Sequence, residues 1–193
     1  MSISLEKGQK ISLNKSNGEG LSQVIMGLGW DVAQKKSFFG FGGSNESIDL
    51  DASCFLFNDQ NQPVELVYFG QLTGQNGAVK HSGDNLTGEG SGDDETITVN
   101  LSALPANIKA LVFTVSSYRG QTFEQVNNAF CRLIDGSNRQ EIARYNLSAQ
   151  GKHTAQIMAK IYRHNGEWKM HAIGENAQGA TPNLIIPQIL PHL

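Results

Sequence analysis

Residues 154–173 read Thr154-Ala-Gln-Ile-Met-Ala-Lys-Ile-Tyr-Arg163-His-Asn-Gly166-Glu-Trp-Lys-Met-His-Ala-Ile173 and carry the clearest structural signal in the chain. Apolar and polar residues alternate on both sides of the Asn-Gly pair. Such a pair between two alternating segments is typical of a tight β-hairpin. The sequence therefore predicts antiparallel strands at residues 154–163 and 167–173.

Other short apolar segments, separated by Gly, Asn and Asp, predict further strands. They lie at residues 24–30, 48–57, 65–69, 96–101, 110–115, 129–134 and 141–147. Residues 3–5 and 11–13 predict a first hairpin around Lys7-Gly8-Gln9, and residues 123–130 fit a short helix or a bulged strand. The expected fold class is all-β, mainly an antiparallel β-sandwich with at most one or two short helices. The glycines at 27 and 29 indicate close packing beside their strand.

The 193 residues suit a single domain, residues 1–193, ending in a proline-containing tail. We expect this tail, residues 181–193, to be either an extended segment lying on the domain or a loose end. No segment approaches the roughly 20 apolar residues of a membrane span. The N-terminus lacks an apolar signal-peptide core, so we expect a cytoplasmic protein. Cys54 and Cys131 lie in apolar segments and predict buried core thiols, and two cysteines cannot form a disulfide framework for a chain of this length.

Charge is unevenly distributed along the chain. Residues 1–95 hold 13 acidic and 6 basic residues, whereas residues 96–193 hold 5 acidic and 9 basic residues. The formal net charge is -3. An acidic half repels phosphate groups, so we expect no direct binding of nucleic acid.

Much of the acidic charge lies in residues 81–95, His81-Ser-Gly-Asp-Asn-Leu-Thr-Gly-Glu-Gly-Ser-Gly-Asp-Asp-Glu95, which contain five carboxylates and no Lys or Arg. Two unit charges about 6 Å apart repel by about 0.7 kcal/mol in water and about 3 kcal/mol at an effective dielectric of 20. The segment is therefore either a solvated open turn or the holder of a cation. Oxygen donors from Asp, Asn, Thr and glycine carbonyls suit Ca²⁺, whereas Zn²⁺ would require His and Cys.

Two further acidic segments favour the interpretation that this part of the chain binds a cation. Asp31 follows the strand at 24–30, and Asp49 and Asp51 lie two residues apart, hence on one face of a strand. If the three segments meet at one end of the sandwich, they form an oxygen-lined cup. The pattern is not an EF-hand. Gly88-x-Gly90-x-Gly92 suggests a phosphate cradle, but no Lys follows it.

A loop of basic and aromatic residues precedes Asp49. Phe38, Phe39 and Phe41 follow Lys35 and Lys36 in a glycine-rich stretch. The stretch is either a hairpin tip whose rings fold back or a docking element for a partner or a membrane surface.

Several segments, taken in order, resemble the TerD family of tellurium-resistance and stress proteins. They are Gly27-Leu-Gly-Trp-Asp31, Asp49-Leu-Asp-Ala-Ser53, Gly83-Asp-Asn-Leu-Thr-Gly88, Gly92-Asp-Asp-Glu95, Gln121-Thr-Phe123 and Ala143-Arg-Tyr145. The resemblance implies a cytoplasmic bacterial β-sandwich that binds two Ca²⁺ ions at one end. It also implies partners among other tellurium-resistance proteins, in an assembly peripheral to the inner membrane. Ser91 stands where relatives often have Asp, which removes one charged donor.

The ligand set implied by the resemblance combines side-chain oxygens and backbone carbonyls. Its members are Asp31, Asp49, Leu50, Asp51, Gly83, Asp84, Asn85, Thr87, Gly88, Glu89, Gly90, Asp93, Asp94 and Glu95. The function expected from this set is that of a non-catalytic, calcium-dependent docking module. Two alternatives are a metal-dependent, phosphatase-like hydrolase using the same carboxylates, and a thiol-based defence through Cys54 or Cys131.

Overall fold

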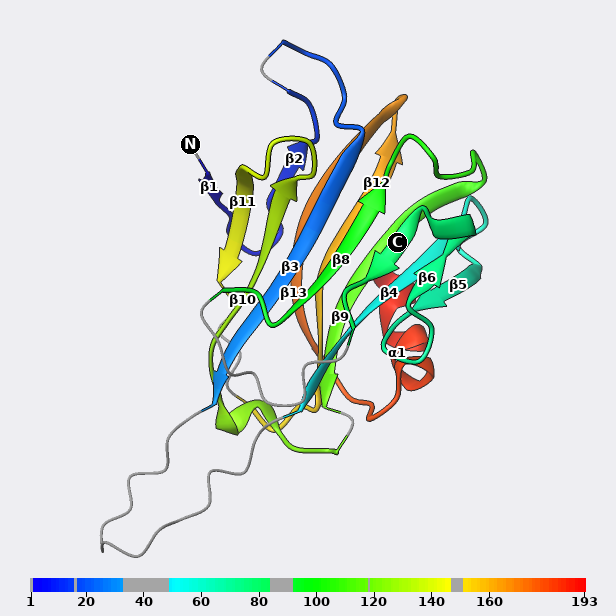
Figure 1. Ribbon diagram of the computed structural model, residues 1–193. Coiled ribbons are helices and arrows are strands. Elements are labelled where there is room, and N and C mark those ends of the chain that lie inside the picture. The colour runs from blue at the N-terminus through cyan, green and yellow to red at the C-terminus, as the bar shows by residue number, and fades with distance from the viewer. Residues whose placement is uncertain (1, 16, 33–48, 84–91, 118, 147–150) are drawn as a thin grey trace, which may run out of the picture.

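The chain forms two β-sheets that face each other (Figure 1). The computed structural model describes residues 2–15, 17–32, 49–83, 92–117, 119–146 and 151–193. Sheet A contains, in spatial order, β1 (Ile3–Ser4), β11 (Glu141–Asn146), β10 (Val126–Asp135), β3 (Gln23–Val32), β8 (Glu95–Asn100), β7 (Val79–His81) and β6 (Thr73–Gly74). Sheet B contains β2 (Lys10–Ser12), β13 (Glu167–Ala177), β12 (Ala155–His164), β9 (Ile108–Ser117), β4 (Leu50–Asn58) and β5 (Pro63–Val67).

The predicted fold class is confirmed. Strand pairs are antiparallel except for the parallel pair of β1 and β11. The described residues contain one α-helix, α1 (Pro182–Ile189), and three short 3₁₀ turns, η1 (Gln75–Gly77), η2 (Phe123–Gln125) and η3 (Leu190–His192). The hairpin of β12 and β13 is confirmed, although β13 continues past the predicted end to Ala177.

The first predicted hairpin is wrong. β1 pairs with β11 in sheet A, whereas β2 pairs with β13 in sheet B, so the turn between them crosses from one sheet to the other. Gly8 has a φ of 84°, which glycine adopts without strain, so the turn signal itself is correct. A short helix and a bulged strand were the two alternatives for residues 123–130, and the structure contains both. The 3₁₀ turn η2 leads into β10, whose register with β3 shifts between Asn127 and Phe130.

The extended conformation expected for residues 181–193 is also wrong, since this segment forms α1 and η3. Pro182 stands at the start of the helix, where a missing N–H costs nothing. Ile185 and Ile189 lie four residues apart and bury one face of the helix. This face packs on the outer face of sheet B with Phe55 and Phe57, so the helix is stabilised by burial.

The larger core lies between the two sheets and includes both cysteines. Burial raises the pKa of the Cys54 thiol, and burial raises the pKa of Cys131 to about 12. A buried thiol is a poor nucleophile, because the reactive species is the thiolate. The core position predicted for both residues is confirmed, and it argues against a thiol-based defence.

We expect a thiol reagent to leave both cysteines of the native protein unlabelled over the time in which it labels them completely in denaturant. Mass spectrometry of the two samples measures this. Rapid labelling of Cys54 or Cys131 in the native state would contradict the burial of that thiol.

Candidate metal centre

The described parts of the three acidic segments lie at one end of the sandwich, where β3 ends and β4 and β8 begin (Figure 1). The backbone N–H of Asp94 donates to the carbonyl of Leu28 at 2.8 Å, and the N–H of Trp30 donates to Asp94 Oδ2 at 2.8 Å. The N–H of Ala52 donates to Glu95 Oε2 at 2.7 Å. Hydrogen bonds therefore tie the end of the acidic segment to both sheets.

Glu95 and His81 form a buried pair that contacts the backbone of β4 at Ala52. β5 pairs with β4 only from Cys54 onward, so the polar groups of Ala52 lie beyond the end of that neighbour. Glu95 satisfies the N–H of Ala52, and His81 Nε2 lies 3.2 Å from the Ala52 carbonyl oxygen and 3.3 Å from Glu95 Oε2. Both side chains are fully buried.

The tautomer of His81 follows from its other ring nitrogen. The N–H of Gly83 donates to Nδ1 at 3.0 Å, so Nδ1 carries no proton. Nε2 therefore carries the proton and donates it toward Ala52 and Glu95. His81 is thus a structural partner of the predicted ligand Glu95, a role that its position in the sequence did not indicate.

Asp93 lies on the outer face of sheet A, paired with Arg132. Arg132 Nε lies 2.6 Å from Asp93 Oδ1, and Arg132 Nη2 lies 3.0 Å from Oδ2. The hydrogen bonds to Asp93 are the main cause that raises the pKa of Arg132. Arg132 also contacts Glu141 at 3.3 Å. Both oxygens of this predicted ligand are therefore bound by a guanidinium, and its coordination of a cation stays a prediction.

Two glycines of β3 make room for this outer layer. A Cβ atom on Gly27 would collide with the carboxylate of Asp93. A Cβ atom on Gly29 would collide with the ring of Phe130 and lie 2.8 Å from the carbonyl oxygen of Gly92. The close packing predicted from these glycines is confirmed. Arg144 lies over the ring of Phe130, 4.1 Å from its centroid.

Asp49, just before β4, and Asp51, its second residue, are buried carboxylates, 6% and 4% exposed. Leu50 between them belongs to the core between the sheets, so the two carboxylates lie on the outer face of sheet B. Asp49 Oδ2 lies 3.2 Å from Arg119 Nε, and Asp51 is in register with Ser116. The sequence did not indicate Arg119 or Arg132 as partners, because each comes from a strand or loop distant in sequence.

The structure describes only some of the remaining predicted residues. The backbone of Asp31 pairs with Asn127, and its side chain lies outside what the structure describes. The following lie wholly outside the described residues: Phe38, Phe39, Phe41, Asp84, Asn85, Thr87, Gly88, Glu89 and Gly90. Among the side chains that are described, no three His, Cys, Asp or Glu residues are grouped closely enough to hold a metal ion.

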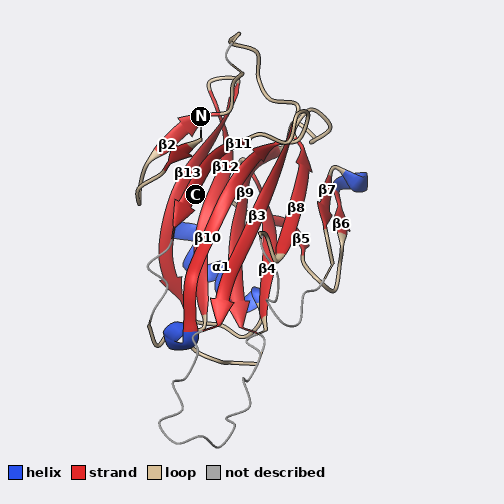
Figure 2. Cartoon of the chain, turned by 60° about the vertical axis from the view of Figure 1, so that its left-hand side comes forward, coloured by secondary structure: helices blue, strands red, loops and turns tan. Residues whose placement is uncertain are grey.

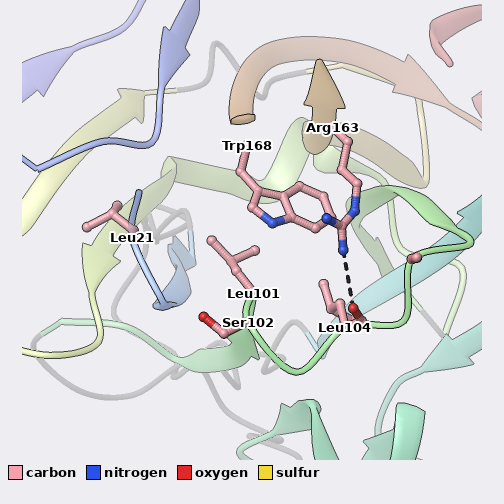
Figure 3. A pocket seen from close by; sticks show the side chains of 7 residues that line it. Leu21, Leu101, Ser102, Leu104, Arg163 and Trp168 are labelled. Atoms are coloured by element: carbon pink, nitrogen blue, oxygen red, sulfur yellow. Dashed lines mark hydrogen bonds between the residues drawn. The ribbon is translucent and has the colours of Figure 1, made fainter. Parts of the chain in front are cut away.

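A pocket of about 360 Å³ lies at the opposite end of the sandwich, where β8 ends (Figure 3). Its wall is formed by Trp168 and Arg163, whose guanidinium carbon lies 4.3 Å from the centre of the indole ring. Arg163 Nη2 donates to the carbonyl of Leu104 at 3.2 Å. The pocket contains none of the predicted ligands.

The TerD domain matches residues 1–185, so the chain belongs to the TerD family, whose members include tellurium-resistance and stress proteins. The tellurium resistance protein TerZ of Serratia marcescens is 50% identical to it over 93% of this chain and 92% of that protein. General stress protein 16U of Bacillus subtilis (strain 168) is 46% identical over 93% of each chain.

A solved structure supports the fold. A homologue of the telluride resistance protein TerD from Streptomyces coelicolor A3(2) superposes with a TM-score of 0.69 and is 22% identical, covering 86% of this chain and 96% of its own. None of the relatives named here bears the name of an enzyme, so they lend no support to the hydrolase alternative. Within the described part of the chain, no helix is both long and apolar enough to cross a bilayer.

Proposed function

We propose that this TerD-family protein is a non-catalytic Ca²⁺-binding β-sandwich that acts as a calcium-dependent docking module in tellurium resistance and the stress response. The observation that carries the proposal is that the buried carboxylates Asp49 and Asp51 stand at the end of the sandwich where Asp94 and Glu95 are hydrogen-bonded to both sheets. In the sequence, residues 84–91 supply further oxygen donors immediately before this segment. Buried carboxylates repel one another strongly when no cation is near.

The chemistry of the donors fits Ca²⁺. Every predicted donor at this end is an oxygen atom, and hard cations such as Ca²⁺ take six to eight of them. Asp49, Asp51 and Asp94 would hold the metal together with donors of the acidic loop. Asp93 and Glu95 already contact Arg132 and His81, so they support the proposal mainly as anchors of that loop. The bound ion would neutralise the carboxylates and order their surroundings.

The partners we propose are other tellurium-resistance proteins, contacted in the cytoplasm at the periphery of the inner membrane. Support comes from the tellurium-resistance and stress names of the relatives. Phe38, Phe39 and Phe41 are the docking residues proposed from the sequence, since they follow two lysines and precede Asp49.

Calcium titration tests the site. We expect excess Ca²⁺ to raise Tm above that in chelator, because a ligand at 100 times its Kd stabilises the folded state by about 2.7 kcal/mol. Calorimetry should show binding that Asp49→Asn and Asp51→Asn each weaken by at least about tenfold, the loss typical even for outer partners of a metal ligand. Asp59→Asn, an exposed aspartate in the turn after β4, is the matched control. Superimposable melting curves in Ca²⁺ and chelator would refute the proposal.

A further inference from the structure

A row of three basic side chains crosses the outer face of sheet B. Lys160 on β12 is in register with His171 on β13, and His171 is in register with Lys10 on β2. Figure 2 shows β12, β13 and β2 side by side. Met170 and Ala172, the neighbours of His171, belong to the core between the sheets, so the row points outward. Directly opposed residues on antiparallel strands have Cβ atoms about 5 Å apart.

The C-terminal segment borders this row. Lys160 Nζ donates to the backbone carbonyl of His192, and it lies 4.9 Å from the centre of the Tyr162 ring. His192 adds a fourth basic group beside the row. Lys160 and His171 are half-buried and Lys10 is exposed, so the exposure of the row increases toward β2.

The charges of this row are not balanced by carboxylates. No described acidic group forms an ion pair with Lys10, Lys160, His171 or His192. His171 Nδ1 is buried, and no described group within hydrogen-bond distance satisfies it. Like charges directly opposite each other on adjacent strands are destabilising. The arrangement is unusual in a protein whose formal net charge is -3.

The pKa shifts agree with this geometry. Burial lowers the pKa of Lys160, and the charge of Lys10 lowers it further. Burial also lowers the pKa of His171, with further contributions from Lys10, Lys160 and His192. An anion bound beside these side chains would oppose these shifts, because it favours the charged form of each group.

We infer that Lys10, Lys160 and His171 form a binding site for a small, doubly charged oxyanion such as sulfate or inorganic phosphate. Two ammonium groups and one imidazole N–H supply several donors around a compact anion. The half-buried position of Lys160 and His171 suits an ion of this size, whereas a lipid surface would reach mainly Lys10. This site lies on the outer face of sheet B and does not depend on the proposed calcium site.

NMR titration with sulfate tests the inference, since sulfate keeps its double charge while the imidazoles titrate. We expect saturating sulfate to raise the pKa of His171, measured from its ring proton shifts, above its value in sodium chloride of equal ionic strength. Lys10→Gln and Lys160→Gln should each weaken sulfate binding by at least about fivefold, because each removes one attracting charge at short range. Lys80→Gln, an exposed lysine on β7 of sheet A, should bind like the unchanged protein.

The results of this titration distinguish a bound oxyanion from contact with a membrane surface. Lys10 is exposed, so Lys10→Gln should fold even if Lys160→Gln does not. Equal affinities of Lys10→Gln and Lys80→Gln, or equal effects of sulfate and chloride, would overturn the inference. Inorganic phosphate should compete with sulfate. Lys10-dependent sedimentation with phosphatidylglycerol vesicles, without a sulfate effect on His171, would also overturn it and assign the lysine to a membrane surface.

Discussion

Replacing Glu95 by alanine is expected to lower the free energy of unfolding by about 1–3 kcal/mol, the cost typical of leaving a buried hydrogen-bond donor unsatisfied. Glu95 accepts the N–H of Ala52 at 2.7 Å, and His81 Nε2 lies 3.3 Å from the same oxygen. The substitution therefore leaves a buried N–H and an imidazole with fewer partners.

Urea denaturation measures this change through the midpoint and slope of the unfolding transition. Glu167→Ala is the matched control, because Glu167 is exposed at the first position of β13. We expect that control to change stability by less than about 0.5 kcal/mol. A loss below about 0.5 kcal/mol for Glu95→Ala, the range of the exposed control, would show that the hydrogen bonds of Glu95 do not stabilise the contact between the sheets.

Replacing Gly29 by alanine is expected to cost about 1–3 kcal/mol, the usual price of overfilling a packed site. The added methyl group would collide with the Phe130 ring, over which the Arg144 guanidinium also lies. It would also lie 2.8 Å from the carbonyl oxygen of Gly92, a backbone atom that cannot rotate away. We therefore expect residues 92–95 to shift and calcium affinity to fall together with stability.

Gly20→Ala is the control for this substitution. A Cβ atom on Gly20 would meet nothing closer than Asn14 Oδ1 at 4.0 Å. Thermal melting and calcium calorimetry of both variants measure the effect. If Gly29→Ala melts like Gly20→Ala, the outer face of sheet A does not hold the acidic segment in the way described.

The hairpin of β12 and β13 could be predicted because its information is local. Asn165 and Gly166 both have positive φ, 51° and 81°, and the residues on either side alternate. The turn at Gly8 was equally visible, but a turn does not reveal which strand each arm joins. Pairing of β1 with β11 and of β2 with β13 depends on contacts far apart in sequence.

The same distinction applies to the candidate site. Repulsion among neighbouring carboxylates is a property of the local sequence, so the acidic end could be inferred from Asp49, Asp51 and residues 81–95. The partners of those carboxylates could not. Arg132 reaches Asp93 because β10 lies beside β3 in sheet A, and only the topology fixes that order.

The first dozen residues of the chain supply an edge strand to each sheet, through β1 and β2. Their partners lie far along the chain, since Ile3 pairs with Ala143 of β11 and Lys10 with His171 of β13. During synthesis β1 and β2 therefore stay unpaired until β11 and β13 have emerged from the ribosome, and unpaired strand edges invite association between nascent chains.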